Sequence, residues 1–145
     1  MQFDLEEGVK YLKDVRRIND NVLPILYGDL FYSKVKRSEP IVIKISYGDK
    51  CVGGLLAFKD NTNYIIATLC VYTKYQGMKC GTLLLNRFIE IIKTKDIKVV
   101  QVQVQTTNET ALTLYMKHGF IQIKEVPKAY PSLKCSSAYL LQLNL

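Results

Sequence analysis

Alternating apolar and polar residues predict three consecutive β-strands in the first half of the chain. Ile41–Tyr47 alternates strictly, with Lys44 and Ser46 on the face opposite the isoleucines. A Gly-Asp turn separates this run from Cys51–Phe58, so the two strands predict a hairpin. Tyr64–Val71 follows a second polar turn and is more fully apolar. The pattern therefore predicts an antiparallel meander.

Helical periodicity occurs on both sides of these strands. Apolar residues spaced by three and four positions predict an amphipathic helix over residues 5–19, and Pro24 prevents its continuation. Residues 28–37 predict a second, short helix. After the third strand, a strong helical stripe is formed by Leu84, Leu85, Phe88, Ile91 and Ile92.

The last third of the chain predicts a β-α-β unit followed by a final strand. Val99–Gln105 alternates valine with glutamine, which is typical of a strand with one polar face. Thr107–Glu109 is a helix start, because Asn or Thr caps free N–H groups, and Gly119 ends that helix. Phe120–Lys124 and Ala138–Leu143 predict two more strands. The order of elements predicts an α+β or mixed α/β architecture.

The segment between the third strand and the next helix, Leu69–Thr82, carries the clearest functional signal. An apolar run leads into a polar loop with two glycines, and a helical pattern follows directly. Backbone N–H groups at a helix start are unpaired, and the aligned peptide dipoles favour an anion there. A protein without a metal can hold a pyrophosphate in this way, so we expect a nucleotide-like cofactor.

Length and composition narrow the class of protein. The 145 residues suffice for one buried core, and we expect a single domain over residues 1–145. No apolar run approaches the ~20 residues of a membrane span, and the first residues lack the pattern of a secretory signal. Four cysteines without CxxC spacing and one histidine argue against a metal site. We therefore expect free thiols, a cytoplasmic location with the nucleus as a second compartment, and no membrane partner.

The net charge of +7 indicates either solubility or attraction to an anion such as a cofactor phosphate, an acidic partner or RNA. Lysines are spread over the whole chain, which is typical of a solvated surface. The sequence has no dense basic block with interleaved aromatic residues. A nucleic-acid binder is therefore disfavoured.

Several short phrases match a known pattern. Tyr75–Thr82 resembles the loop pattern Q/R-x-x-G-x-G/A, with Lys79 at the first glycine, and the strand end Leu69–Val71 precedes it. Asn108–Ala111 and Leu114–Phe120 match N-E-x-A and x-Y-x-x-x-G-F. On these phrases the chain resembles the GNAT superfamily of acetyl-CoA-dependent N-acetyltransferases. Leu23–Tyr32 is similar to the F-P-V-x-Y-x-x-x-F-Y phrase of N-terminal acetyltransferase E catalytic subunits (the San homologues).

The resemblance implies the GNAT fold, a central mixed and mostly antiparallel sheet of six to seven strands flanked by four helices. It also implies acetyl-CoA as cosubstrate and direct attack of a neutral amine on the thioester, without an acyl-enzyme. Loop N–H groups would hold the pyrophosphate, and the strand backbone would pair with the pantetheine arm. The implied cofactor-binding residues are Leu69, Cys70, Val71, Gln76, Gly77, Met78, Lys79, Cys80, Gly81, Thr82, Asn108 and Tyr115.

The resemblance implies three catalytic candidates. Tyr115 would protonate the departing thiolate or hold it by a hydrogen bond, although its helix-face position is also typical of a core tyrosine. Gln103 stands where the subfamily has a catalytic His and would hold a relaying water, unless it is part of an ordinary polar strand face. The subfamily's catalytic Tyr aligns with Ile65, so Tyr64 acts only if a bulge or another register turns it to the site. Lys79 replaces the first glycine of the loop pattern.

The peptide groove is implied to lie between two loops. Leu23, Pro24 and Tyr27 would form one wall and Tyr130 the other, the alternatives being a loop packed on the core and a surface turn. His118 shares the apolar face of its helix and is interpreted as a packing or capping residue.

We therefore expect an N-acetyltransferase that acts on protein or nascent-chain N-termini, chiefly those that begin with Met. The α-amine has a pKa near ~8 against ~10.4 for lysine, so it needs less help to become neutral. One alternative is a catalytically weak subunit that binds a larger N-terminal acetyltransferase complex or the ribosome. The other is an enzyme acting on lysine side chains or a small amine. Nucleic acid is expected as a partner only through ribosome association.

Overall fold

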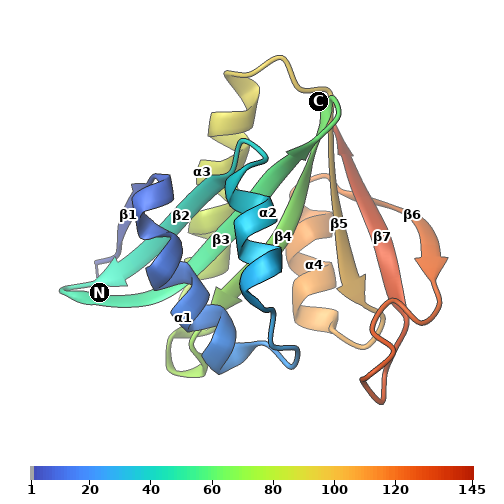
Figure 1. Cartoon of the computed structure of the whole chain (residues 1–145), viewed down its shortest axis with the longest axis horizontal. Helices are drawn as coiled ribbons and strands as arrows, with labels where there is room; N and C mark the ends of the chain where they lie inside the picture. Colours follow the sequence, from blue (N-terminus) through green and yellow to red (C-terminus); the bar gives the residue numbers. More distant parts are fainter. Residues whose placement is uncertain (1) are drawn as a thin grey trace.

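The computed structural model describes residues 2–145 and arranges them in three layers (Figure 1). The middle layer is a seven-stranded sheet of order β1-β2-β3-β4-β5-β7-β6. Neighbouring strands are antiparallel except β4 and β5, which are parallel. The strands are β1 (Asp4–Glu7), β2 (Ile41–Tyr47), β3 (Lys50–Asp60), β4 (Asn63–Val71), β5 (Val99–Gln105), β6 (Ile121–Val126) and β7 (Ala138–Asn144).

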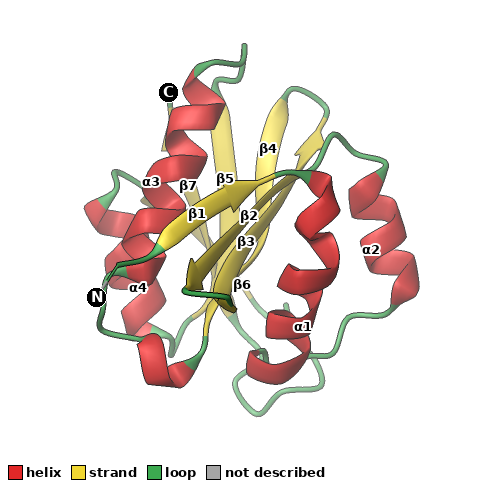
Figure 2. Ribbon diagram, turned by 90° about the vertical axis from the view of Figure 1, so that its left-hand side faces the viewer, coloured by secondary structure: helices red, strands yellow, loops and turns green. Residues whose placement is uncertain are grey.

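Helices cover the sheet from both sides, with α1 and α2 on one face and α3 and α4 on the other (Figure 2). Within residues 2–145 no helix is long and apolar enough to cross a membrane. The predicted mixed, mostly antiparallel sheet with four helices is confirmed. The helices are α1 (Leu12–Val22), α2 (Asp29–Lys36), α3 (Cys80–Lys93) and α4 (Glu109–Lys117), with 3-10 turns at Val9–Tyr11 and Thr73–Tyr75.

The two helical layers give the sheet two buried faces. Ile43 of β2 is in a larger core that includes Phe88 of α3. Val42, the next residue along β2 from Ile43, is in a smaller core with Val15 of α1. The strict alternation of β2 therefore separates two cores rather than a core and a solvated surface.

The predicted helix over residues 5–19 is wrong at its start. Asp4–Glu7 forms β1 and pairs with β2, with Leu5 opposite Ile45. Gly8 has φ 143°, a conformation that favours glycine, and α1 begins only at Leu12. Without β1, the outer edge of β2 would be unpaired. The backbone hydrogen bonds that β1 makes to this edge outweigh the local preference for a helix.

β4 and β5 are paired over a short stretch and then separate. Tyr64–Ile66 pairs with Val100–Val102, and the strands diverge toward their carboxyl ends (Figure 1). A bulge at Ala67, which has no partner on β3, lies at the same point. Among residues 2–145, no strand pairs with the β5 side of Leu69–Val71. The backbone groups of this segment that do not bond to β3 therefore face the gap, where the Val71 carbonyl accepts from the Gln76 side chain.

Candidate active site

A groove of about 730 Å³ lies between the β4–α3 loop, the first turn of α3, and α4. We call it the α3–α4 groove. Residues of α4 line the groove as well as residues of the loop, so the site extends beyond the loop that the sequence indicated. The predicted cofactor residues in this lining are Leu69, Val71, Gln76, Gly77, Lys79, Cys80, Gly81, Thr82, Asn108 and Tyr115.

The loop before α3 is shaped by its own backbone. The Gln76 side chain donates from Nε2 to the Val71 carbonyl at 3.0 Å, which ties the loop to the end of β4. Gly77 has φ 82° and open space where a Cβ would stand. Lys79 has φ 67°, a left-handed conformation that costs a residue with a Cβ roughly 1 kcal/mol. The loop pattern has a glycine at this position because glycine adopts this conformation without that cost.

The start of α3 can accept an anion. Lys79 is the N-cap residue but provides no side-chain hydrogen bond, and the first turn has no acidic residue. The N–H groups of the first turn have no acceptor within the helix. Together with the helix dipole and the Lys79 ammonium, they suit a diphosphate at the mouth of the groove.

A narrow passage of about 120 Å³ occupies the gap between β4 and β5. Leu69, Asn108 and Tyr115 line both this passage and the α3–α4 groove. Gln103 and Tyr130 line both the passage and a third hollow, of about 520 Å³, on the α1–α2 side of the sheet. We call this third hollow the strand-face hollow. The three hollows meet where β4 and β5 separate.

Two loops wall the passage on the strand-face side. Leu23, Pro24 and Tyr27, from the connection between α1 and α2, line it opposite Tyr130, from the connection between β6 and β7. The Tyr27 ring stacks on Phe31 with centroids 4.3 Å apart. Burial raises the pKa of both Tyr27 and Tyr130, so both phenols stay neutral at physiological pH. The structure thus brings the four predicted substrate residues together.

Tyr115 lies at the junction of the passage and the groove. It is 3 % exposed, and its ring packs on Phe120 with centroids 5.2 Å apart. Burial, with smaller contributions from Cys70 and Tyr130, raises the pKa of the Tyr115 phenol far above its ordinary value. The phenol therefore keeps its proton near pH 7, which suits a donor and excludes a base.

Gln103 is the free member of a row of three glutamines on β5. Gln101 donates to Gln142 Oε1 and Gln105 donates to the Cys135 carbonyl, each at 2.8 Å. Within residues 2–145 the Gln103 side chain has no such hydrogen bond; the Tyr130 hydroxyl donates instead to the backbone carbonyl of Gln103, at 3.5 Å. Its amide is available to hold a water in the passage, and that role stays a prediction.

Asn108 both caps a helix and lines the site. It is the N-cap of α4, where its Oδ1 accepts from the Ala111 N–H at 3.2 Å, as the helix-start pattern predicted. It also lines the passage and the groove. Its cap fixes the first turn of α4 beside the gap.

The prediction that Tyr64 is catalytic is contradicted by its position. Tyr64 is 1 % exposed in the larger core, and its hydroxyl donates to the Glu39 carbonyl at 2.9 Å. Ile65, one residue along, lines the strand-face hollow. The bulge at Ala67 lies after both residues and so cannot turn Tyr64 toward the site.

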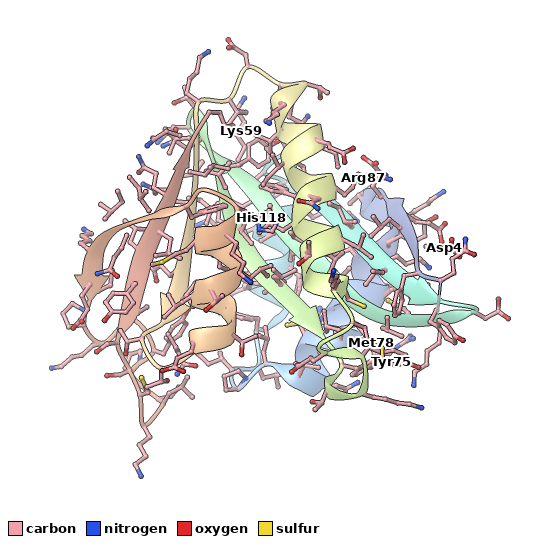
Figure 3. The ribbon with its side chains drawn as sticks, turned by 180° about the vertical axis from the view of Figure 1, so that it is seen from behind. Asp4, Lys59, Tyr75, Met78, Arg87 and His118 are labelled. Carbon is pink, nitrogen blue, oxygen red and sulfur yellow. The ribbon has the colours of Figure 1, made fainter. Side chains whose placement is uncertain are left out.

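Two predicted cofactor residues do not line the α3–α4 groove within the described part of the chain. Cys70 is 4 % exposed, and burial raises the pKa of its thiol to about 12. Met78 is exposed at the loop tip, near Tyr75 (Figure 3). Cys80 does line the groove, but burial raises the pKa of its thiol as well. A thiol that keeps its proton is a poor nucleophile, in agreement with transfer without an acyl-enzyme.

His118 fastens the two helices of the groove to each other. Figure 3 shows it between α3 and α4. Its Nδ1 lies 2.8 Å from the Leu114 carbonyl, and its Nε2 lies 2.8 Å from Asn86 Oδ1 of α3. Gly81 contributes to the same contact, since a Cβ there would stand 3.2 Å from Leu114 Cδ2. These contacts agree with the packing role predicted for His118.

The lining of the passage and of the strand-face hollow carries no Asp, Glu, His, Lys or Arg among residues 2–145. The same part of the chain contains no cluster of three potential metal ligands. Polar groups there are hydroxyls, amides and backbone. This side of the site therefore offers no strong base and no fixed charge to a substrate.

Several lining residues were missed from the sequence. Thr68 was the polar exception in an apolar strand, and Ile25 directly follows Pro24, so both had a local signal. Thr113 and Lys117 of α4 line the α3–α4 groove, and the polar face of that helix was their signal. Leu133 comes from the β6–β7 connection, where no pattern indicated a site.

Comparison with known proteins places this site in context. A family model described as the acetyltransferase (GNAT) family matches residues 11–120. N-alpha-acetyltransferase 50 of Danio rerio is 27% identical over 139 residues, which cover 92% of this chain and 83% of that protein. The probable N-acetyltransferase san of Drosophila melanogaster is 26% identical over 139 residues, covering 92% and 76%.

Solved structures share the fold. Arabidopsis thaliana Naa50 in complex with the bisubstrate analogue CoA-Ac-MVNAL aligns over 100% of both chains, with a TM-score of 0.86 and 24% identity. The ribosomal-protein-S18-alanine N-acetyltransferase of Escherichia coli aligns over 99% of this chain and 94% of that chain, with a TM-score of 0.87 and 14% identity.

Proposed function

This chain belongs to the GNAT acetyltransferase family and is an acetyl-CoA-dependent N-acetyltransferase; we propose that its acceptor is the N-terminal α-amine of protein chains, chiefly those that begin with Met. The uncharged lining of the passage and the strand-face hollow carries this proposal. An amine bound there must be neutral without help from a carboxylate or an imidazole. About one α-amine in ten is neutral at pH 7, whereas a lysine amine is almost wholly charged.

The apolar walls support a protein terminus over a small polar amine. Leu23, Pro24 and Ile25 lie on one side of the passage and Leu133 on the other. Such side chains suit the unbranched side chain of an N-terminal Met. The strand-face hollow continues beyond the passage and offers room for the residues that follow.

The chain's own residues have separate tasks in the transfer. N–H groups of the first turn of α3 bind the diphosphate, and the free backbone of Leu69–Val71 orients the arm that follows it. Acetyl-CoA supplies the acetyl group as an activated thioester. Tyr115 is placed to hold the departing sulfur by donating a hydrogen bond, and Gln103 to hold the water that receives a proton from the amine. A backbone N–H of β4 polarises the carbonyl.

A peptide panel tests the acceptor. We expect acetylation of Met-starting peptides with a free N-terminus and none of the same peptides when the N-terminus is blocked, even if they contain lysine. Matched pairs that differ only in the N-terminal block, followed by mass spectrometry, provide the control. Acetylation of blocked, lysine-containing peptides alone would contradict the proposal and favour a lysine acetyltransferase.

The pH dependence follows from the same lining. Below the α-amine pKa of ~8, we expect kcat/KM to rise about tenfold per pH unit, because only the neutral amine reacts. The raised pKa of Tyr115 keeps the donor protonated, so no fall in activity is expected up to pH 10. Initial rates from pH 6 to pH 10 measure this, and a plateau that begins near pH 6.5 would indicate a base that the lining does not contain.

Lys79 separates conformational strain from charge at the loop. Lys79→Gly relieves the left-handed strain and removes one charge, whereas Lys79→Ala removes the charge and keeps the strain. We expect the free energy of unfolding, measured with urea, to be about 1 kcal/mol higher for the glycine variant than for the alanine variant. Both should bind acetyl-CoA roughly two- to fivefold more weakly by calorimetry, as for a partly exposed ion pair. Unequal affinities of the two variants would mean that loop shape outweighs charge.

A further inference from the structure

Asn19 is a buried amide that joins three elements beneath the bulge of β4. It lies in the last turn of α1 and is 1 % exposed. Its Nδ2 donates to the Tyr32 hydroxyl of α2 at 3.1 Å and to Thr68 Oγ1 of β4 at 3.0 Å. One side chain therefore fastens both helices of this layer to the strand that borders the gap.

The oxygen of the same amide is left without a partner. Asn19 Oδ1 is buried and accepts no hydrogen bond from any group of residues 2–145. An unpaired buried carbonyl is unfavourable, and a leucine of similar size would avoid that cost. Packing of α1 on the sheet alone therefore does not account for an amide at this position. The reason for an amide here must therefore be the two hydrogen bonds that it donates, to Tyr32 and to Thr68.

Thr68 is the point at which Asn19 reaches the site. Ile66 and Leu69 pack in the larger core, whereas Ala67 packs in the smaller core, and Thr68 bonds to α1. The bulge thus places two successive side chains on one face. Without the extra residue, every later side chain and N–H group of β4 would change direction. The orientation of Leu69–Val71 depends on keeping Thr68 on the α1 side.

We propose that Asn19 is a positioning residue: by holding Thr68 it fixes the bulge and aims the free backbone of Leu69–Val71 into the gap between β4 and β5. Asn19 lines none of the three hollows, so it acts through the strand and not on a substrate. The inference rests on the proposed function in one respect, namely that acetyl transfer takes place in this gap.

Four substitutions separate positioning from packing. Asn19→Leu and Thr68→Val each remove the bond that reaches β4, and Thr68→Ser keeps it. Tyr32→Phe is the matched control, since it removes the other bond of the same amide and leaves the one to Thr68 intact. We expect the first two to lower kcat about tenfold or more while peptide KM and acetyl-CoA Kd stay within about twofold. Tyr32→Phe should keep kcat near the wild-type value, and Thr68→Ser should lose less kcat than Thr68→Val.

A cycle with the double variant excludes a direct effect of Thr68 on substrate. If both residues act through one bond, Asn19→Leu combined with Thr68→Val should have the kcat of either single variant. Multiplied losses would overturn the inference, as would an unchanged kcat in Asn19→Leu. If Asn19→Leu fails to fold, Asn19→Ala, which also removes both N–H bonds of the amide, takes its place in the cycle.

Amide hydrogen exchange provides a readout that does not depend on activity. We expect the amides at the end of β4 that bond to β3, such as the Tyr72 N–H that donates to the Val52 carbonyl at 2.9 Å, to exchange about tenfold faster in Thr68→Val than in Tyr32→Phe, with the central strands unchanged. Equal exchange in the two variants would overturn the inference. If the wild-type chain acetylates no peptide, the proposed function fails, but the exchange result still decides whether Asn19 positions β4.

Discussion

Replacing Tyr115 with phenylalanine is expected to lower kcat about 10²-fold and to leave the Kd for acetyl-CoA within about twofold. The phenol lies where the passage meets the α3–α4 groove, and burial keeps it protonated. Phenylalanine preserves the ring contact with Phe120 and removes only the hydroxyl. Steady-state kinetics with a Met-starting peptide, combined with calorimetry, measure both quantities. An unchanged kcat would remove Tyr115 from the mechanism.

Tyr64→Phe is the matched control for this loss. It also deletes one phenolic hydroxyl, but that hydroxyl donates to the Glu39 carbonyl in the core and is remote from the three hollows. We expect a loss of about 1 kcal/mol in unfolding free energy and a kcat equal to wild type. A large fall in kcat would restore Tyr64 as a catalytic candidate and contradict its position in the structure.

Gly53→Ala is expected to destabilise the fold by about 3 kcal/mol. A Cβ at Gly53 would stand 2.7 Å from the Cys70 carbonyl and 3.1 Å from side-chain carbons of Ile45 and Val71. The first of these is backbone, which cannot move aside as the end of a flexible side chain can. Relief requires β3 and β4 to separate at the end of β4 that borders the groove. Urea unfolding measures the loss.

Gly28→Ala is the control for the glycine substitution. Gly28 has φ −90°, and no atom lies within 4 Å of the Cβ position. Because Gly28 is the N-cap of α2, a small loss of less than about 1 kcal/mol is expected. If both variants lost the same stability, the close approach of β3 and β4 would not be the cause.

The sequence was a good guide where local pattern and tertiary structure agree. The three antiparallel strands are present because their alternation matches the pleat and Gly48 permits the turn at φ 61°. β1 could not be predicted, because Leu5 and Val9 fit a helical spacing and only the free edge of β2 favours a strand. The covering of both sheet faces by helices is likewise a tertiary property that strand periodicity does not contain.

The site was predictable in its backbone and less so in its side chains. The loop before α3 and the N-cap at Asn108 follow local rules, and both lie where the pattern indicated. The choice between Tyr64 and Ile65 depended on the position of a bulge, and that position is fixed by Ala67 and the pairing of β3. Asn19 gave no signal, because a polar residue in an amphipathic helix is expected to face solvent.

The α3–α4 groove and the strand-face hollow open on opposite sides of the sheet and meet only at the passage. The coenzyme in the α3–α4 groove would therefore not block the strand-face hollow, and an acceptor in that hollow would not block the groove. The two could bind in either order. Coenzyme could then leave and enter through the α3–α4 groove while the proposed polypeptide acceptor stays bound on the other side of the sheet. A polypeptide acceptor, as proposed, would insert only its N-terminal residues, so its length and the folding of its remainder would not limit access.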